Sequence, residues 1–156
     1  LDPGVVAARR NVMTHTNEEI LALWARYWSI NDKPREPELL ISLFTEDCYY
    51  EDVPSKTVVN GKDEFRTFIH MVHNAFSDFQ MKLENIHADE HAGFMTWMMY
   101  GVHTGDRPGK PATGKAFAVP GSTYVQFRDG KIAHNRDFYC SKDVAIQMGI
   151  LSADVH

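Results

Sequence analysis

Residues 100–139 read YGVHTGDRPGKPATGKAFAVPGSTYVQFRDGKIAHNRDFY. Two β-type segments flank the turn sequence Arg128-Asp129-Gly130, which is typical of a hairpin. Side chains alternate between the two faces of a strand, so Asn135, Asp137 and Tyr139 are predicted to share one face. A carboxylate on a half-buried face is costly unless it is paired, hydrogen-bonded or neutralised by a raised pKa. Because general acid–base chemistry uses carboxyl groups with raised pKa values, Asp137 is the first candidate functional residue.

Composition and charge indicate one soluble globular domain. The chain has 156 residues, of which 44% are hydrophobic and 24% charged, and no apolar run approaches the length of a membrane span. The formal charge is −5 and the basic residues are scattered, which argues against a nucleic-acid partner and favours small molecules or proteins. Cys48 and Cys140 lack CxxC spacing, so we expect neither a disulfide framework nor a zinc site, and a reduced cytoplasmic location.

The ends of the chain are predicted to lie outside the domain. The sequence begins with Leu1, and Met13 followed by Thr-His-Thr-Asn-Glu-Glu is typical of a natural start. Residues 1–15 are therefore interpreted as an arm or an expression remnant, without the apolar segment of a secretory signal. Residues 16–150 form the predicted domain, and 151–156 form a tail.

The first half of the chain has mainly helical periodicity. Thr16 and Glu19 form a capping-box pattern, and the apolar spacing after them predicts a helix over about 17–31. Pro37 suits the first turn of a second, short helix. A short strand is predicted over 48–53, and a third helix starts at Asn60-Gly61.

The second half changes to a period of two residues. It predicts strands over 79–88, 93–104, 116–127 and 131–139, followed by a helix over about 141–149. Helices first and an antiparallel meander afterwards indicate an α+β fold, with N-terminal helices packed on a curved antiparallel sheet. A curved sheet covered by helices in this way forms a cone that encloses a pocket.

The order of these elements resembles the nuclear transport factor 2-like superfamily over residues 16–150. The segments HTGDRPGKPATGK (103–115), FRDGKI (127–132) and NRDFY (135–139) resemble the SnoaL-like polyketide cyclase branch. The resemblance implies a cone-shaped α+β barrel, whose pocket lies between the helices and the concave face of the sheet.

The same resemblance implies a role for Asp137. It occupies the Arg-Asp-aromatic motif whose acid serves SnoaL-like cyclases as general acid/base in an intramolecular aldol closure, and limonene epoxide hydrolases place a catalytic Asp in a similar motif. Thr123 stands where some cyclases have a second catalytic group, a His, and 97–100 lack the Arg and Asp of the hydrolases. The alternative is that Asp137 merely pairs with Arg136, Arg128 or a backbone donor.

The helical half resembles ketosteroid isomerases. LWARYWSIN (23–31) and LFTEDCYYEDVP (43–54) imply that Tyr27 donates a hydrogen bond to a dienolate oxygen and that Asp52 moves the proton. Thr123 stands in place of the isomerase's second oxyanion donor and can still donate one hydrogen bond. The alternatives are a core position for Tyr27 and a capping role for Asp52 beside the proline turn.

Together these residues predict one apolar cavity for proton abstraction next to a carbonyl. Two carboxylates in one pocket push their pKa values apart, which supplies an acid and a base without any cofactor. The catalytic candidates are Asp137, Asp52 and Tyr27, and the predicted substrate-binding residues are Trp24, Tyr50, Trp97, Met99, His103, Phe117 and Thr123.

The eight histidines do not predict a metal site. His70 and His73 are three residues apart, without the carboxylate or HExxH spacing that a metal centre needs. His103 can line the pocket mouth, although a surface or loop-stabilising role is the simpler interpretation. The glycines of 105–114 lack a phosphate-binding context, and this loop is interpreted as a lid or a dimer contact.

Three functions are compatible with these residues. The leading hypothesis is a cofactor-independent cyclase or isomerase acting on an apolar carbonyl compound such as a polyketide. The second is a ketosteroid isomerase-like double-bond isomerase, and the third a noncatalytic ligand-binding or association domain.

The last strands predict a homodimer. Their outward face is expected to carry Tyr124, Ile132 and Phe138 beside His134 and Arg136, which is more apolar and aromatic surface than a monomer usually exposes. We therefore expect a twofold dimer formed sheet to sheet.

Overall fold

The computed structural model describes residues 14–29, 37–106 and 109–154. Residues 1–13 of the predicted arm lie outside the described residues, as do positions 30–31 of the first predicted helix. That helix ends earlier than predicted, at Trp28, because Ser29 has an extended backbone conformation. The elements in chain order are α1 (Asn17–Trp28), α2 (Pro37–Ile41), β1 (Phe44–Asp52), β2 (Thr57–Asn60), α3 (Gly61–Ala75), β3 (Phe76–Ala88), β4 (Ala92–His103), β5 (Ala116–Arg128), β6 (Lys131–Tyr139) and α4 (Ser141–Gln147).

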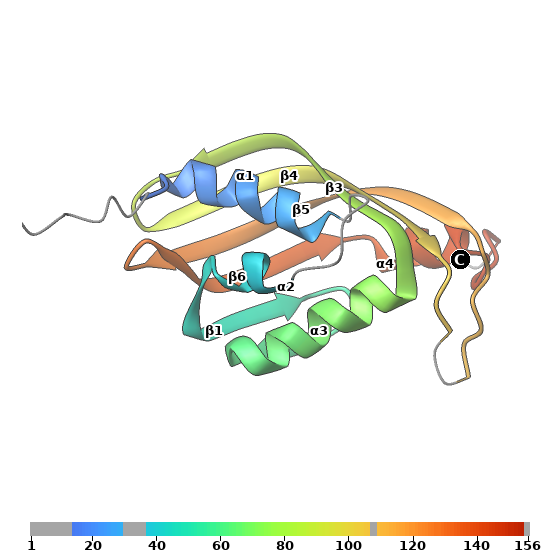
Figure 1. Cartoon of the computed structure of the whole chain (residues 1–156). Helices are drawn as coiled ribbons and strands as arrows, with labels where there is room; N and C mark the ends of the chain where they lie inside the picture. The colour runs from blue at the N-terminus through green and yellow to red at the C-terminus, as the bar shows by residue number, and fades with distance from the viewer. Residues whose placement is uncertain (1–13, 30–36, 107–108, 155–156) are drawn as a thin grey trace, which may run out of the picture.

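The strands form one curved sheet in the order β2-β1-β6-β5-β4-β3 (Figure 1). The predicted α+β fold with helices on a curved sheet is confirmed. The sheet does not close into a barrel, and the β1–β6 pair is parallel, whereas the other pairs are antiparallel. The short strand β2, which was not predicted from the sequence, pairs with β1.

Helix α1 begins where the capping pattern predicts. The Thr16 side chain accepts a hydrogen bond from the Glu19 backbone N–H at 3.1 Å. At the other end, Ser29 Oγ donates to the Ala25 carbonyl and accepts from the Met81 N–H at 2.9 Å, which ties the helix to β3. The buried face of α1 consists of Ile20, Leu21, Trp24, Ala25 and Trp28.

The β5–β6 hairpin is the predicted one. Arg128 pairs with Lys131, and the two residues between them, Asp129 and Gly130, have φ values of 53° and 73°. Positive φ at both central positions is the geometry of the tight hairpin turn that Asp-Gly favours. This turn and a one-residue register shift between Gln126 and Phe127 together place Thr123 opposite Asp137.

The predicted outward position of Ile132 is wrong. The pairing of β6 with β5 shifts between Gln126 and Phe127, and its pairing with β1 is also irregular, so the alternation of faces is interrupted after Ile132. Ile132 is 0% exposed and packs in the core with Phe44 as its strand neighbour. Asn135 and Asp137 keep the predicted common inward face, and Phe138 points outward.

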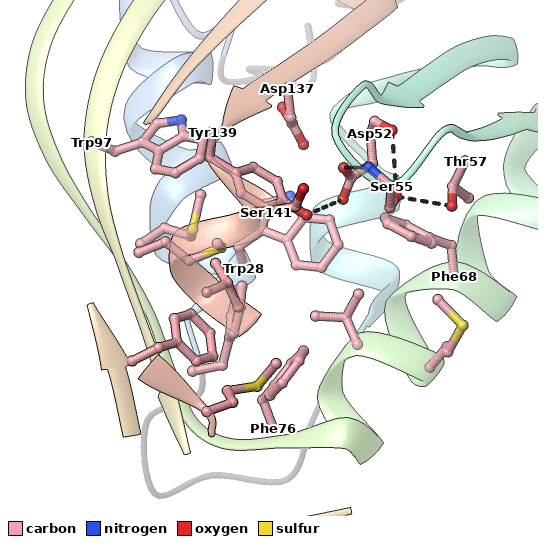
Figure 2. A pocket seen from close by; sticks show the side chains of 18 of the residues that line it. Trp28, Asp52, Ser55, Thr57, Phe68, Phe76, Trp97, Asp137, Tyr139 and Ser141 are labelled. Atoms are coloured by element: carbon pink, nitrogen blue, oxygen red, sulfur yellow. Dashed lines mark hydrogen bonds between the residues drawn. The ribbon is translucent and has the colours of Figure 1, made fainter. Parts of the chain in front are cut away.

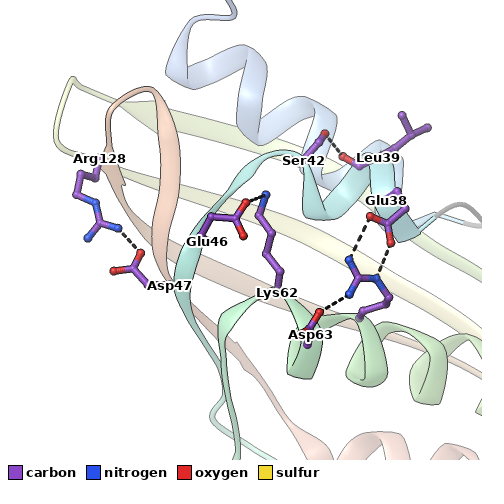
Figure 3. A network of polar contacts seen from close by, with 9 residues as sticks. Glu38, Leu39, Ser42, Glu46, Asp47, Lys62, Asp63 and Arg128 are labelled. Atoms are coloured by element: carbon purple, nitrogen blue, oxygen red, sulfur yellow. Dashed lines mark hydrogen bonds and ion pairs between the residues drawn. The ribbon is translucent and has the colours of Figure 1, made fainter.

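Helices α1 and α3 pack against the sheet, α1 on β3 and β4 and α3 on β1 (Figure 1). At the surface, Arg66 of α3 pairs with Glu38 of α2, and Lys62 of α3 pairs with Glu46 of β1 at 3.0 Å (Figure 3). Exposed ion pairs of this kind stabilise a fold only slightly. The buried apolar faces therefore supply most of the packing energy. Among the described residues, no helix has both the length and the apolar character needed to cross a membrane.

Candidate active site

A cavity of about 530 Å³ lies between the concave face of the sheet and the helices. Pockets of this size commonly hold small organic ligands. Figure 2 shows Asp52 and Asp137 near one end of this cavity and Phe76 toward the other. Its lining is mainly aromatic and aliphatic: Trp24, Trp28, Tyr50, Phe68, Met71, Val72, Phe76, Phe79, Met81, Trp97, Met99, Phe117, Tyr139, Val144, Ala145 and Met148.

Asp137 is held at the cavity wall by three donors. The Tyr50 hydroxyl donates to Oδ2, Thr123 Oγ1 donates to Oδ1 at 2.7 Å, and Asn135 Nδ2 donates to Oδ1 at 2.9 Å. The side chain comes from β6 and the residue is 7% exposed. Burial raises its pKa from 3.8 to about 7, because loss of hydration outweighs the opposing effect of the three hydrogen bonds.

Asp52 is the second carboxylate of the cavity and lies at the end of β1. Its Oδ2 accepts from the Tyr139 hydroxyl at 3.0 Å, and its Oδ1 accepts from the Ser55 backbone N–H at 3.2 Å. The expected capping role and the expected cavity position are thus both present. Burial raises the pKa of Asp52, and the Ser55 and Tyr139 donors oppose this shift.

The two carboxylates form crossed pairs with tyrosines. Tyr50 of β1 bonds Asp137 of β6, and Tyr139 of β6 bonds Asp52 of β1. The parallel register sets Asp52 beside Asp137, so each tyrosine reaches across to the other strand. The negative charge of Asp52 adds to the rise in the pKa of Asp137.

No ion pair of Asp137 occurs among the described residues. Arg136 pairs with Glu51 on the outer face at 2.8 Å, and Arg128 pairs with Asp47 (Figure 3). The alternative in which Asp137 is a partner of either arginine is therefore wrong. Within the described lining of the cavity, Lys110 is the only basic residue.

Seven of the predicted site residues line the cavity, and three do not. Tyr27 of α1 is partly buried against the core and is not part of the cavity lining, whereas Trp24 and Trp28 of the same helix are. Thr123 is 0% exposed and lies behind Asp137. The seven that line the cavity are Trp24, Tyr50, Asp52, Trp97, Met99, Phe117 and Asp137.

His103 also lies away from the cavity. Its Nδ1 accepts from the Thr113 backbone N–H at 3.3 Å, and its ring contacts Phe76. The residue is buried and joins the end of β4 to the following loop. This geometry corresponds to the loop-stabilising interpretation.

Several residues of the cavity lining were not predicted from the sequence. Tyr139 shares the inward face of Asp137 by simple alternation, and Trp28 follows Trp24 by one helical turn, so both carried a usable signal. Ser141, Val144 and Met148 lie on or next to α4 and also line the cavity. Nothing in the sequence says where this last helix packs.

The sequence is similar to that of known proteins. The sequence model of the SnoaL-like polyketide cyclase family matches residues 18–147. Aklanonic acid methyl ester cyclase AcmA of Streptomyces galilaeus is 31% identical over 84 residues, 53% of this chain. That match spans 58% of the relative's length.

Solved structures share the fold at low sequence identity. A Catenulispora acidiphila protein with a ketosteroid isomerase-like fold, solved with trimethylamine, has a TM-score of 0.73 at 20% identity, with 90% of this chain and all of that chain covered. TsrD from Streptomyces laurentii has a TM-score of 0.71 at 18% identity, covering 85% and 94%. The family match extends over most of the chain and includes both strands that carry the carboxylates. The chain belongs to the SnoaL-like polyketide cyclase family, with the ketosteroid isomerase-like fold of the nuclear transport factor 2-like superfamily.

Proposed function

We propose that this protein is a cofactor-independent cyclase that closes a ring in a polyketide-type carbonyl compound, with Asp137 as the proton carrier. One observation carries the proposal: Asp137 is buried in an apolar cavity with a pKa of about 7 and has no cationic partner among the described residues. A general acid or base works best when its pKa lies near the operating pH. Near neutrality such a group is present in both forms, so it can accept a proton and return it.

The reaction needs only proton transfers and one carbon–carbon bond. The Asp137 carboxylate removes a proton from the carbon next to a substrate carbonyl, which breaks a C–H bond and forms an enolate. The enolate carbon attacks a second carbonyl carbon of the same molecule and leaves an alkoxide. The alkoxide takes up one proton, Asp137 is again a carboxylate, and the product is an isomer of the substrate.

The cavity favours an apolar, partly aromatic substrate. Tryptophan, phenylalanine and methionine side chains make up much of its wall, and polar groups gather near the carboxylates. The relative's substrate is named by its own name, aklanonic acid methyl ester, and we propose this neutral ester as the first compound to test.

Double-bond isomerisation is the second candidate. Asp52 lines the cavity and its pKa is raised by burial, which supports a second proton carrier. Tyr27 is not part of the cavity lining, so this reaction has less support with Tyr27 as its oxyanion donor than with another phenol. A noncatalytic binding role has less support, because neither carboxylate is in an ion pair among the described residues and the cavity is not filled by side chains.

The test compares Asp137→Asn with Glu51→Gln. Purified proteins are mixed with aklanonic acid methyl ester, and ring closure is followed by chromatography and mass spectrometry of the equal-mass product. Removing a positioned acid/base lowers the rate by roughly 10²- to 10⁴-fold. Glu51 lies on the outer face of β1, so its variant should keep the wild-type rate. A fall of less than about tenfold in Asp137→Asn would remove Asp137 from the mechanism.

We also propose that two copies associate through the outer face of β5 and β6. With Ile132 in the core, this face still presents Phe138, which is 36% exposed, and Tyr124. Arg136 stacks over the Phe138 ring at 5.1 Å, and His134 stacks on Tyr49. Sedimentation at micromolar concentration should give twice the mass of one chain, and Phe138→Lys should give a monomer. A monomeric wild-type protein would reject the dimer.

A further inference from the structure

The two oxygens of Asp137 have different partners. The Trp97 indole N–H can only donate, and it donates to Thr123 Oγ1 at 2.9 Å. Thr123 therefore accepts from Trp97 and uses its single hydroxyl hydrogen for Asp137 Oδ1 at 2.7 Å. The Thr123 hydrogen is committed to Asp137 and is not available to a ligand.

This arrangement keeps the proton of Asp137 on one oxygen. Oδ1 already accepts from Thr123 and from Asn135 Nδ2, so it is an acceptor whether Asp137 is ionised or neutral. When Asp137 binds a proton, the proton is on Oδ2. Oδ2 is the oxygen in contact with the Tyr50 hydroxyl.

We propose that Tyr50 is a catalytic residue that passes a proton between Asp137 Oδ2 and an oxygen atom of the substrate. The proposal rests on the proposed function, because it takes Asp137 as the proton carrier. In the ionised state the pair has one hydrogen, which lies in the contact between Tyr50 and Oδ2. When Asp137 is neutral, the Tyr50–Asp137 pair has two hydrogens. Only one of them is used in the contact between the Tyr50 hydroxyl and Oδ2, so the other can be donated to a third atom.

The surroundings of Tyr50 favour movement of a proton over movement of the side chain. Its ring is stacked on Phe65, with centroids 4.7 Å apart, and contacts Trp28 and Phe44 at 6.1 Å. The residue is 1% exposed, yet it belongs to the cavity lining together with Asp137. Burial, and then the charge of Asp137, raise the pKa of Tyr50 well above its usual value, so the phenol returns to the neutral form after each transfer.

The relay balances within the proposed ring closure. Asp137 Oδ2 takes the proton from the substrate carbon, and the enolate attacks the second carbonyl. Tyr50 then gives its phenolic hydrogen to the resulting alkoxide, and it receives the Oδ2 hydrogen from Asp137. One C–H bond and the π bond of the attacked carbonyl are broken, one C–C and one O–H bond are formed, and both side chains end as they began.

The experiment uses Asp137→Asn as a fixed copy of the neutral acid. Its amide oxygen can accept from Thr123 and Asn135, so its amide nitrogen faces Tyr50 and leaves the phenolic hydrogen free. The probe is para-nitrophenol, whose anion is coloured and resembles an enolate oxygen on an apolar ring. We expect Asp137→Asn to bind the coloured anion more tightly than the wild type does at alkaline pH, where the charges of Asp137 and the nearby Asp52 oppose an anion.

Adding Tyr50→Phe to Asp137→Asn should weaken binding of the anion by about ten- to a hundredfold, because a hydrogen bond to a charged group is lost. The matched control is Tyr49→Phe in the same background, since Tyr49 donates to Glu51 on the outer face of the same strand. This control should bind the anion unchanged. Equal binding with and without the Tyr50 hydroxyl would overturn the proposal.

A second measurement is the absorbance of the probe bound to the single variant Asp137→Asn. It requires no substitution at Tyr50, so it tests the proposal even if the double variant does not fold. Binding as the anion supports free donors at this site, whereas binding as the neutral phenol, or no binding, overturns the proposal. Turnover rates distinguish failure of the proposed function from failure of the Tyr50 relay. If Asp137→Asn keeps the wild-type rate, the proposed function fails; if it is inactive while Tyr50→Phe keeps the wild-type rate, only the relay fails.

Discussion

The two faces of β1 and β6 carry the same residue types in different surroundings. On the outer face, the Tyr49 hydroxyl donates to Glu51 at 3.1 Å, and Arg136 donates to the same carboxylate at 2.8 Å. On the inner face, Tyr50 donates to Asp137, and no arginine or lysine pairs with that carboxylate among the described residues. Each face thus has a tyrosine–carboxylate pair, and within the described part of the chain only the outer pair includes a cation.

This difference reverses the direction of the pKa shift. The hydrogen bond from Arg136 lowers the pKa of Glu51, whereas burial raises the pKa of Asp137 to about 7. Glu51 is therefore a fixed negative charge near neutral pH, and Asp137 is a group that can exchange a proton. Access to water and to a cation, more than residue type, decides which carboxylate can do chemistry.

The largest expected effect is on the pH dependence of stability. Between about pH 4 and about pH 7 the folded protein holds the Asp137 proton that the unfolded chain releases, so the free energy of unfolding falls as pH rises. A rise from 3.8 to about 7 corresponds to roughly 4 kcal/mol at 1.36 kcal/mol per pKa unit. Asp137→Asn removes this contribution and should be the more stable protein above about pH 7. Urea unfolding of both proteins across this range measures the difference, and parallel curves would contradict the assigned pKa.

A smaller effect is expected from Thr123→Val. This change removes one donor from Asp137 and leaves the buried Trp97 N–H without its acceptor. The pKa of Asp137, which Asp52 and Tyr50 also face, should rise further, and the rate near neutral pH should fall about tenfold and recover at higher pH.

The control for that variant is Ser122→Ala, because Ser122 is paired with Phe138, next to Thr123 but away from the cavity. Its pH–rate profile should match the wild type. An unchanged pH–rate profile in Thr123→Val would show that Thr123 does not affect the pKa of Asp137.

The smallest effect is expected from Glu51→Gln. The outer ion pair is partly exposed, so its loss should lower the melting temperature by no more than about 2 °C near neutral pH. Because the pKa of Glu51 is lowered in the folded state, its contribution is present above the ordinary pKa of glutamate and disappears as pH falls. This sign is opposite to that of Asp137. Thermal melts at neutral and acidic pH test it, and a larger loss at acidic pH would contradict the pairing with Arg136.

Local sequence patterns determined most of the elements and one half of the site. The capping pattern at Thr16, the Asp129-Gly130 turn and the change of period near Phe79 each depend on neighbours within a few residues, and all three correspond to observed features. The inward direction of Asp137 follows from the same short-range alternation along β6.

Only the tertiary structure decided which groups meet in the cavity. Tyr50 and Asp137 are 87 residues apart, as are Asp52 and Tyr139, and they meet because β1 pairs in parallel with β6. The same packing left Tyr27 out of the cavity lining and, through an irregular register, placed Ile132 in the core. Periodicity gives the face on which a side chain lies, but strand partners and register depend on packing between distant segments, which local sequence does not encode.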